Sequence, residues 1–257
     1  MVTSVHYGLI IAGLISGCIV GLTGMGGGAV LTPILVLVFR VPPLQAVSSD
    51  LVVSLLMKPV GGWVHWKRGS VQTSLVRWLC IGSVPTAFIG AALISHANSH
   101  RVESLLKQVI GVTLLLAATA TLLKSRFNKR SAPAQELTVR PLPTVLIGLV
   151  GGMLVGLTSV GSGSLMIVLL LILYPTASAK SLVGTDLVQA IPLVASASLG
   201  HILFGHLSLG LTGSLLIGAI PGVYLGARIS TKASDQFVRP ALVTILFASG
   251  LKLAGVF

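Results

Sequence analysis

The sequence predicts an all-α integral membrane protein made of two homologous halves, and three observations carry this prediction. The 257-residue chain is 54% hydrophobic and only 9% charged, whereas a soluble domain carries about 25% charged residues. Nearly all of it falls into apolar runs long enough to span a bilayer, separated by short basic loops. The second half repeats glycines and polar residues of the first half in one register.

Eight apolar runs are the expected helical elements, four in each half. They cover residues 5–39, 44–64, 72–95, 102–123, 144–173, 179–204, 207–229 and 236–257. The first 39 residues contain no Lys, Arg, Asp or Glu, so we expect them to belong to the mature fold and not to a cleaved signal. A basic, proline-containing linker at 124–143 separates an N-terminal membrane repeat, 1–123, from a C-terminal repeat, 144–257.

Identical residues recur at fixed offsets between the two halves. At an offset of 135, Gly13, Gly17, Gly21 and Thr23 match Gly148, Gly152, Gly156 and Thr158. After a one-residue insertion, at an offset of 136, Asp50, His65, Pro85 and Gly90 match Asp186, His201, Pro221 and Gly226. Shared hydrophobicity does not produce so many identities in one register, so the pattern indicates an internal duplication.

The first run of each half is too long for one crossing and contains a glycine cluster. As one straight helix, residues 5–39 would extend about 50 Å, against a hydrocarbon core of roughly 30 Å. The segment Gly21-Leu22-Thr23-Gly24-Met25-Gly26-Gly27-Gly28 lies inside this run and returns in altered form at 156–163. Because glycine weakens a helix interior by about 1 kcal/mol each, we expect each first run to break there and turn back as a re-entrant hairpin.

The distribution of basic residues favours this topology. If every run crosses, the two faces carry eight and seven basic residues, which gives no orientation. If the first and fifth runs are re-entrant, one face collects twelve, including those of the linker, and the other keeps only Arg40, Arg101 and Lys107. Each half then crosses an odd number of times, which predicts inverted repeats. Eight plain crossings with parallel repeats is the alternative.

The net charge of +12 is accounted for by loops that follow the positive-inside rule, so we expect no nucleic-acid partner. The sequence shows no metal-ligand spacing, no catalytic triad and no nucleotide-binding loop. The glycine clusters lack the lysine and strand context of a phosphate-binding P-loop. We therefore expect a protein that is not an enzyme and that uses no cofactor.

The two glycine clusters are the candidate substrate site. A half-helix that starts after each break, near Ala29 or Ser164, presents free backbone amides and partial positive charge, which suits a small anion. The predicted residues are Thr23, Gly24, Gly26, Gly27 and Gly28 in the first cluster, and Thr158, Gly161, Ser162, Gly163 and Ser164 in the second. The alternative is that these glycines only permit close helix packing.

Ionisable residues inside the runs are further candidates. Asp50, after Ser49, and Asp186, after Thr185, either only cap the second and sixth runs or also act as protonatable groups or cation ligands facing a polar cavity. Lys58 lies in mid-run, where it either snorkels or contacts a bound anion. His65 and His201 lie near run ends, as interface residues or proton relays.

The segments G-L-T-G-M-G-G-G and G-L-T-S-V-G-S-G, each followed about twenty residues later by S-S-D-L or G-T-D-L, resemble the sulfite exporter TauE/SafE family over residues 5–257. The resemblance implies a transporter of small sulfur-containing anions in a bacterial inner membrane, with the linker 124–143 cytoplasmic. It also implies a substrate region at Thr23–Gly28, Thr158–Ser164, Ser49–Asp50 and Thr185–Asp186. Members often have Thr-Ser or Thr-Asn where this chain has Asp.

The predicted function is therefore secondary transport, in the export direction, of a small anion such as sulfite or an organosulfonate. The anion would bind near the bilayer midplane between the two glycine breaks, with proton coupling through the carboxylates. A passive small-anion channel is the main alternative, and a membrane scaffold without transport is a third. The lipid bilayer and the small anion are the expected partners.

Overall fold

The computed structural model describes residues 2–23, 27–67, 69, 71–95, 100–127, 138–204, 207–229 and 235–255. Within these ranges the chain forms ten α-helices, one 3₁₀ turn and no strand, so the all-α prediction is confirmed. The elements are α1 (Val2–Thr23), η1 (Gly27–Ala29), α2 (Leu31–Leu37), α3 (Pro43–Lys67), α4 (Thr73–Ser95), α5 (His100–Phe127), α6 (Pro141–Thr158), α7 (Leu165–Leu173), α8 (Ala179–Leu203), α9 (Leu209–Ile229) and α10 (Asp235–Leu253).

The first run of each half consists of two helices. The 22-residue α1 starts at Val2, just before the run 5–39, and is followed within it by η1 and the seven residues of α2. The 18-residue α6 starts at Pro141, just before the run 144–173, and is followed within it by the nine residues of α7. Both interruptions fall at the glycine clusters, where the low helix propensity of glycine disfavours a continuous helix.

The non-helical part of the linker expected at 124–143 is shorter than that range. Helix α5 continues to Phe127 and α6 starts at Pro141, so both ends of the segment 124–143 are helical. Proline suits the first helical turn because the N–H that it lacks has no partner there. Residues 128–137 lie outside the described ranges.

Five of the described helices are long and apolar enough to cross a bilayer. They contain the spans Thr73–Ile94, Glu103–Leu123, Pro141–Thr158, Ser181–Leu203 and Leu209–Ile229. Large apolar side chains such as Ile81, Leu93 and Ile217 are exposed on their outer faces, as expected for surfaces that contact lipid. The composition of these helices supports an integral membrane protein.

Glycine stripes join the two halves. A Cβ built on Gly13, Gly17 or Gly21 of α1 would lie 2.3, 2.4 and 2.3 Å from the carbonyl oxygens of Leu215, Ala219 and Val223 of α9. On α6, a Cβ at Gly148, Gly152 or Gly156 would lie 2.5, 2.3 and 2.2 Å from the carbonyl oxygens of Leu79, Ser83 and Ala87 of α4. These glycines therefore allow close helix packing and bring the backbones into direct contact.

These two helix pairs are copies of one another. The offset of 135 converts the glycines of α1 into those of α6, and the offset of 136 converts Leu79, Ser83 and Ala87 into Leu215, Ala219 and Val223. Each pair takes one helix from each half, since α1 packs on α9 and α6 packs on α4. The duplication seen in the sequence thus repeats in the contacts, and the halves are interlocked.

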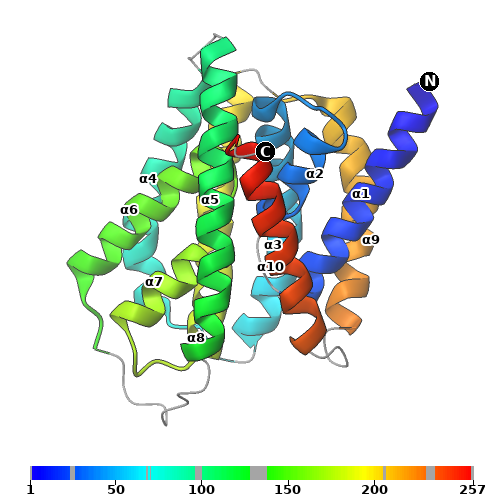
Figure 1. The fold of residues 1–257 in the computed structure, drawn as a ribbon. Helices are drawn as coiled ribbons and strands as arrows, with labels where there is room; N and C mark the ends of the chain where they lie inside the picture. Colours follow the sequence, from blue (N-terminus) through cyan, green and yellow to red (C-terminus); the bar gives the residue numbers. More distant parts are fainter. Residues whose placement is uncertain are drawn as a thin grey trace.

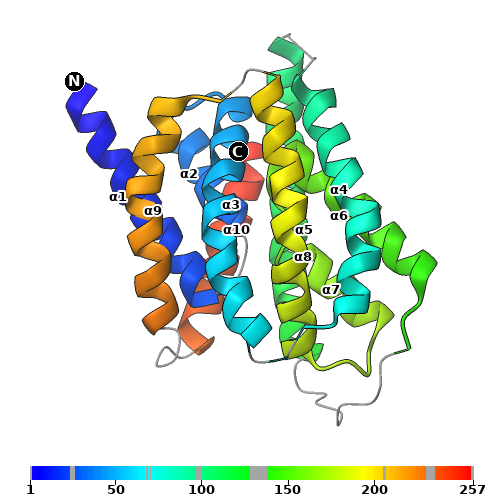
Figure 2. The same cartoon turned by 180° about the vertical axis from the view of Figure 1, so that it is seen from behind.

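The corresponding helices of the two halves run in opposite directions. Helix α3 descends from the end of the bundle where the N-terminus lies, and α8 ascends beside it (Figure 2). Helix α1 descends from that same end and α2 leads back to it, whereas α6 enters from the other end and α7 leads back there (Figure 1). The lower end therefore holds the element ends that carry Lys67, Arg77, Arg140 and Arg228.

The glycine stripe gives a stability test with a matched control on one helix. A Cβ at Gly218 of α9 would lie 1.9 Å from the carbonyl oxygen of Ile10, whereas a Cβ at Gly213 meets nothing within 4 Å. We predict that Gly218→Ala lowers the unfolding free energy by about 1–3 kcal/mol through overpacking. Gly213→Ala should leave it unchanged or raise it slightly. Thermal unfolding in detergent measures both, and equal melting temperatures would contradict the packing described for α1 and α9.

Candidate functional site

The two helix breaks, one from each half, touch each other in the interior. A Cβ on Gly28 would lie 2.2 Å from the carbonyl oxygen of Ser159 and 2.5 Å from its hydroxyl oxygen. The hydroxyl oxygens of Thr32 and Ser159 are 2.8 Å apart. Only glycine at position 28 permits this approach. The structure therefore brings Gly28 of the first cluster against the second cluster and Gly27 against α3, while Gly24 and Gly26 lie outside the described residues.

Asp50 lies beneath this junction and is fully buried. Its Oδ2 accepts hydrogen bonds from the hydroxyl of Ser159 at 2.6 Å and from that of Thr32 at 3.2 Å. A Cβ on Gly27 would come within 3.2 Å of Asp50 Oδ1. One carboxylate thus connects α3, the start of α2 and the second break. Buried carboxylates require such donors because they lose their hydration.

The capping role considered for the two aspartates is wrong. Asp50 is the eighth residue of α3, and Asp186 is the eighth residue of α8. Neither side chain can reach the free amides of a first turn from that position. The N-cap of α8 is Ser178, whose hydroxyl accepts from the N–H of Ser181 at 3.1 Å. Both carboxylates are therefore buried groups in the first half of long helices.

Lys58 connects the first half to the second break. Its side chain is only 4% exposed, so the snorkelling alternative is wrong. The ammonium Nζ donates to the hydroxyl of Ser162 at 2.6 Å. Both Asp50 and Asp186 are close enough to interact electrostatically with it. A single buried cation thus sits among two carboxylates and the serine-rich turn, and this arrangement is rare inside a membrane unless it has a function.

The second break is an irregular turn, and a buried serine hydroxyl beside it has no hydrogen-bond partner among the described residues. Gly161 and Gly163 have φ of 130° and 91°, in the region that favours glycine, and Ser159 adopts 59°. Ser164, which precedes α7, is buried, and its hydroxyl has no hydrogen-bond partner among the described residues. The hydroxyl of buried Ser49 also has no hydrogen-bond partner among the described residues. Such groups are commonly satisfied by water or ligand.

The three predicted threonines face their own helices instead. Thr23 donates to the carbonyl of Ile19 and Thr158 donates to that of Leu154, each at 2.7 Å. Thr185 donates to Ser181 O at 2.8 Å and accepts from the N–H of Gln72 at 3.0 Å. All three hydroxyls therefore have backbone partners, those of Thr23 and Thr158 near the ends of α1 and α6, and that of Thr185 also in the segment before α4.

Three further buried polar side chains make contacts in the interior: Thr32 and Gln189, which the sequence did not single out, and Ser159, which lies within the expected region Thr158–Ser164. Thr32 and Ser159 supply the donors to Asp50. Gln189, one turn after Asp186, donates its amide to the hydroxyl of Ser83 at 2.5 Å. The signal available in the sequence is only that each is a polar side chain within an apolar run.

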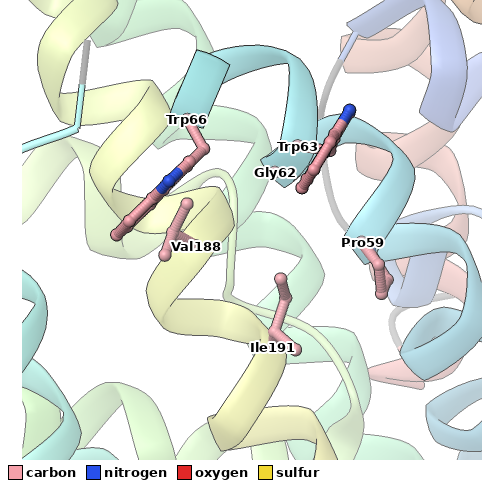
Figure 3. A pocket seen from close by; sticks show the side chains of 6 residues that line it. All are labelled: Pro59, Gly62, Trp63, Trp66, Val188 and Ile191. Atoms are coloured by element: carbon pink, nitrogen blue, oxygen red, sulfur yellow. The ribbon is translucent and has the colours of Figure 1, made fainter. Parts of the chain in front are cut away.

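A separate apolar groove of about 260 Å³ lies between α3 and α8 on the outer side of the bundle (Figure 3). It is lined by Pro59, Gly62, Trp63, Trp66, Val188 and Ile191. Trp63 and Trp66 are 60% and 53% exposed, and the Lys67 ammonium lies 4.9 Å from the ring centroid of Trp63. Aromatic and basic side chains together are typical of a membrane–water interface. None of the predicted site residues lines this groove.

Fold and site together define a helical membrane protein whose two interlocked halves enclose a buried charged centre, the architecture of solute transporters. The family described as "Sulfite exporter TauE/SafE" matches residues 9–253, and the chain belongs to this family. A relative from Bacillus subtilis, "Probable membrane transporter protein YjnA", is 36% identical over 95% of this chain and 98% of its own.

More distant relatives carry similar names. "Probable membrane transporter protein YdhB" of Bacillus subtilis is 25% identical over 95% of this chain and 98% of its own. "Probable membrane transporter protein MJ0441" of Methanocaldococcus jannaschii is 28% identical over 95% and 93%. No solved structure matches. Family and relatives support a membrane transporter.

The donors to Asp50 can be tested by removing one hydroxyl without changing side-chain volume. We predict that Thr32→Val lowers the unfolding free energy by about 1–3 kcal/mol, because a buried carboxylate loses a donor. Thr119→Val is the matched control, since the exposed Thr119 hydroxyl bonds only to carbonyls of its own helix. Chemical denaturation in detergent compares the two variants. A Thr32→Val protein as stable as the control would mean that this contact contributes nothing.

Proposed function

We propose that the protein is a secondary transporter that exports a small oxyanion, such as sulfite or an organosulfonate, from the cytoplasm. The observation that carries this proposal is the hydrogen bond from buried Lys58 of the first half to Ser162 in the second break. An ammonium inside a membrane protein needs a counter-charge. At this place it is held against a turn whose shape depends on two glycines and whose neighbouring Ser164 hydroxyl lacks a partner.

The chemistry of this cluster suits an anion with several oxygens. Lys58 has three N–H donors, and Ser162 takes one of them. An oxyanion beside Ser162 and Ser164 would accept from the ammonium and from the serine hydroxyls together. Amides at the start of α7 would add donors. A side chain at Gly161 or Gly163 would strain the turn before them, because both residues have positive φ. The substrate would thus be bound by the second break and by α3.

The carboxylates give a reason for ion coupling. Asp50 and Asp186 both interact electrostatically with Lys58, so they hold its charge when no anion is bound. An incoming anion would be repelled by two ionised carboxylates through low-dielectric protein. Uptake of a proton together with the anion offsets the negative charge that the anion adds. We therefore propose proton-coupled transport through this site.

We further propose that α1–α2 and α6–α7 are re-entrant pairs that enter from opposite sides, so that the halves are inverted repeats. The opposite directions of α3 and α8 support this arrangement (Figure 2), as does the excess of basic residues at the lower end, which we assign to the cytoplasm of the inner membrane. The breaks then meet inside the bilayer. Movement of one half against the other would open the site to each side alternately.

Reconstituted vesicles test the transport proposal. We predict saturable uptake of sulfite that collapses when the proton gradient is dissipated, and at least about tenfold weaker uptake for Lys58→Met, because a hydrogen bond to a charged group is lost. Lys252→Met is the control, because Lys252 is an exposed lysine near the end of α10. Protein-free vesicles measure passive leak. Gradient-independent flux would indicate a channel, and no flux with any anion would indicate a scaffold; either result contradicts the proposal.

Cysteine labelling tests the topology. Single cysteines at positions 3 and 42 should react with a membrane-impermeant reagent from one side, and a cysteine at Thr176, in the loop between α7 and α8, from the other. Cys18 and Cys80 are first replaced by alanine. Labelling of positions 3 and 42 from opposite sides would show that the first run crosses the membrane.

A further inference from the structure

His201, on α8, is a fully buried residue whose contacts tie together three helices. Its Nε2 lies 3.0 Å from the carbonyl oxygen of Gly156 near the end of α6, and its Nδ1 lies 2.9 Å from the hydroxyl of Ser48 on α3. The Ser48 hydroxyl is also 2.7 Å from the carbonyl oxygen of Leu44. The site proposed above for the anion uses none of these groups.

The break in α6 explains why Gly156 needs this partner. In a continuing helix, the N–H of residue 160 would donate to the carbonyl of residue 156. Here the N–H of Val160 bonds to the hydroxyl of Thr158 at 3.2 Å. His201 supplies a donor to the carbonyl that this rearrangement releases. It also places the imidazole at the C-terminal end of α6, where the helix dipole favours positive charge.

The hydrogen bonds around the ring accommodate two protonation states. Nε2 faces a carbonyl oxygen and must carry a proton in both. In the neutral ring, Nδ1 accepts from the Ser48 hydroxyl. In the charged ring, Nδ1 donates to Ser48, whose own hydroxyl proton turns to the carbonyl of Leu44. Gain of one proton therefore costs no hydrogen bond to the ring, and it requires only rotation of one hydroxyl.

We propose that His201 binds the proton that is transported with the anion, and that its charge state controls how firmly the second break is held against α3 and α8. This inference rests on the proposed function, of which it names the proton-binding residue. Protonation strengthens the bond to Gly156, five residues before Gly161. The break that binds the anion through Ser162 and the group that binds the proton are thus connected by one short stretch of backbone.

Other charged groups on the neighbouring elements have their own contacts or lie far away. Asp50, two residues after Ser48, points to another side of α3 and bonds to Ser159 and Thr32. Asp186 is fifteen residues from His201 on α8, about 22 Å along the axis. Of the helices packed against α8, α3 also carries Lys58, Lys67 and His65, and the side chain of His65 is not described. Helix α4 carries Arg77 and Cys80 near its start. Helices α6 and α7 carry no titratable side chain.

The first experiment does not depend on transport. Hydrogen–deuterium exchange over residues 155–165 is measured at about pH 5.5 and about pH 8, on either side of the ordinary histidine range, after correction for intrinsic exchange. We expect the wild type to protect this segment more at the lower pH. His201→Gln keeps an amide donor for Gly156 but cannot gain a proton, so its protection should not change with pH. A variant that remains as pH-dependent as the wild type would overturn the proposal.

The second experiment separates proton coupling from binding and folding. Vesicles are tested for sulfite and sulfoacetate exchange at equal pH and for accumulation driven by a pH gradient, with melting temperatures measured in parallel. His201→Gln should keep exchange and lose gradient-driven accumulation. Accumulation equal to wild type, or loss of exchange in a variant that melts like wild type, would overturn the assignment of the proton to His201. If the wild type moves neither anion, the proposed function fails, while hydrogen exchange still decides whether His201 controls the break.

Discussion

A helix that is interrupted inside a membrane must have every freed backbone and side-chain polar group satisfied by the protein itself, because lipid offers no hydrogen bonds. The second break of this protein has several of these groups satisfied by residues from several helices, and the Ser164 hydroxyl has no partner among the described residues. The hydroxyl of Thr158 takes the N–H of Val160, and His201 takes the carbonyl of Gly156. Ser159 donates to Asp50, and Ser162 accepts from Lys58. The turn is therefore held by contacts to α3 and α8, and any ligand at this place binds a surface fixed from both halves.

The scaffold and the buried aspartates Asp50 and Asp186 repeat between the halves, whereas the lysine and the serines of the second break do not. The glycine stripes on α1 and α6 contact equivalent carbonyls on α9 and α4. By contrast, the position equivalent to Lys58 is Val194, and those equivalent to Ser159 and Ser162 are Gly24 and Gly27. Duplication produced a symmetric frame in which two helix pairs, α1 with α9 and α6 with α4, each combine one helix from each half. Substitution then placed the cation in one half and the hydroxyl-rich turn in the other, and the binding centre we propose lies where they meet.

The sequence predicted most of the frame and part of the centre. Hydrophobic run length and clustered glycines located the helices and both breaks to within a few residues, because these features act locally. Lys58, Ser162 and Asp50 were also predicted, since ionisable or hydroxyl residues stand out in apolar runs. The partners of these residues were not predictable in this way. Thr32 meets Ser159 across 127 residues of chain, and Ser48 meets His201 across 153.

Local rules also misassigned some residues for identifiable reasons. The aspartates looked like helix caps because a hydroxyl residue followed by a carboxylate is typical of an N-cap, but each lies seven residues after its helix start, at Pro43 in α3 and at Ala179 in α8. The threonines at the ends of α1 and α6 looked like ligand groups, but their hydroxyls return to carbonyls one turn earlier. Only the tertiary arrangement decides between a hydroxyl that closes its own helix and one that faces a neighbour.

The central claim is that an oxyanion binds where Lys58 meets the second break. Anomalous diffraction from crystals grown with selenite, a heavier analogue of sulfite, tests it most directly. We predict a selenium peak beside the Lys58 ammonium and the hydroxyls of Ser162 and Ser164. The Lys58–Ser162 hydrogen bond should then be broken, or both residues should also bond to the bound anion. Selenium found only at the outer groove or in the loops, with Lys58 still bonded to Ser162 as it is here, would contradict the account.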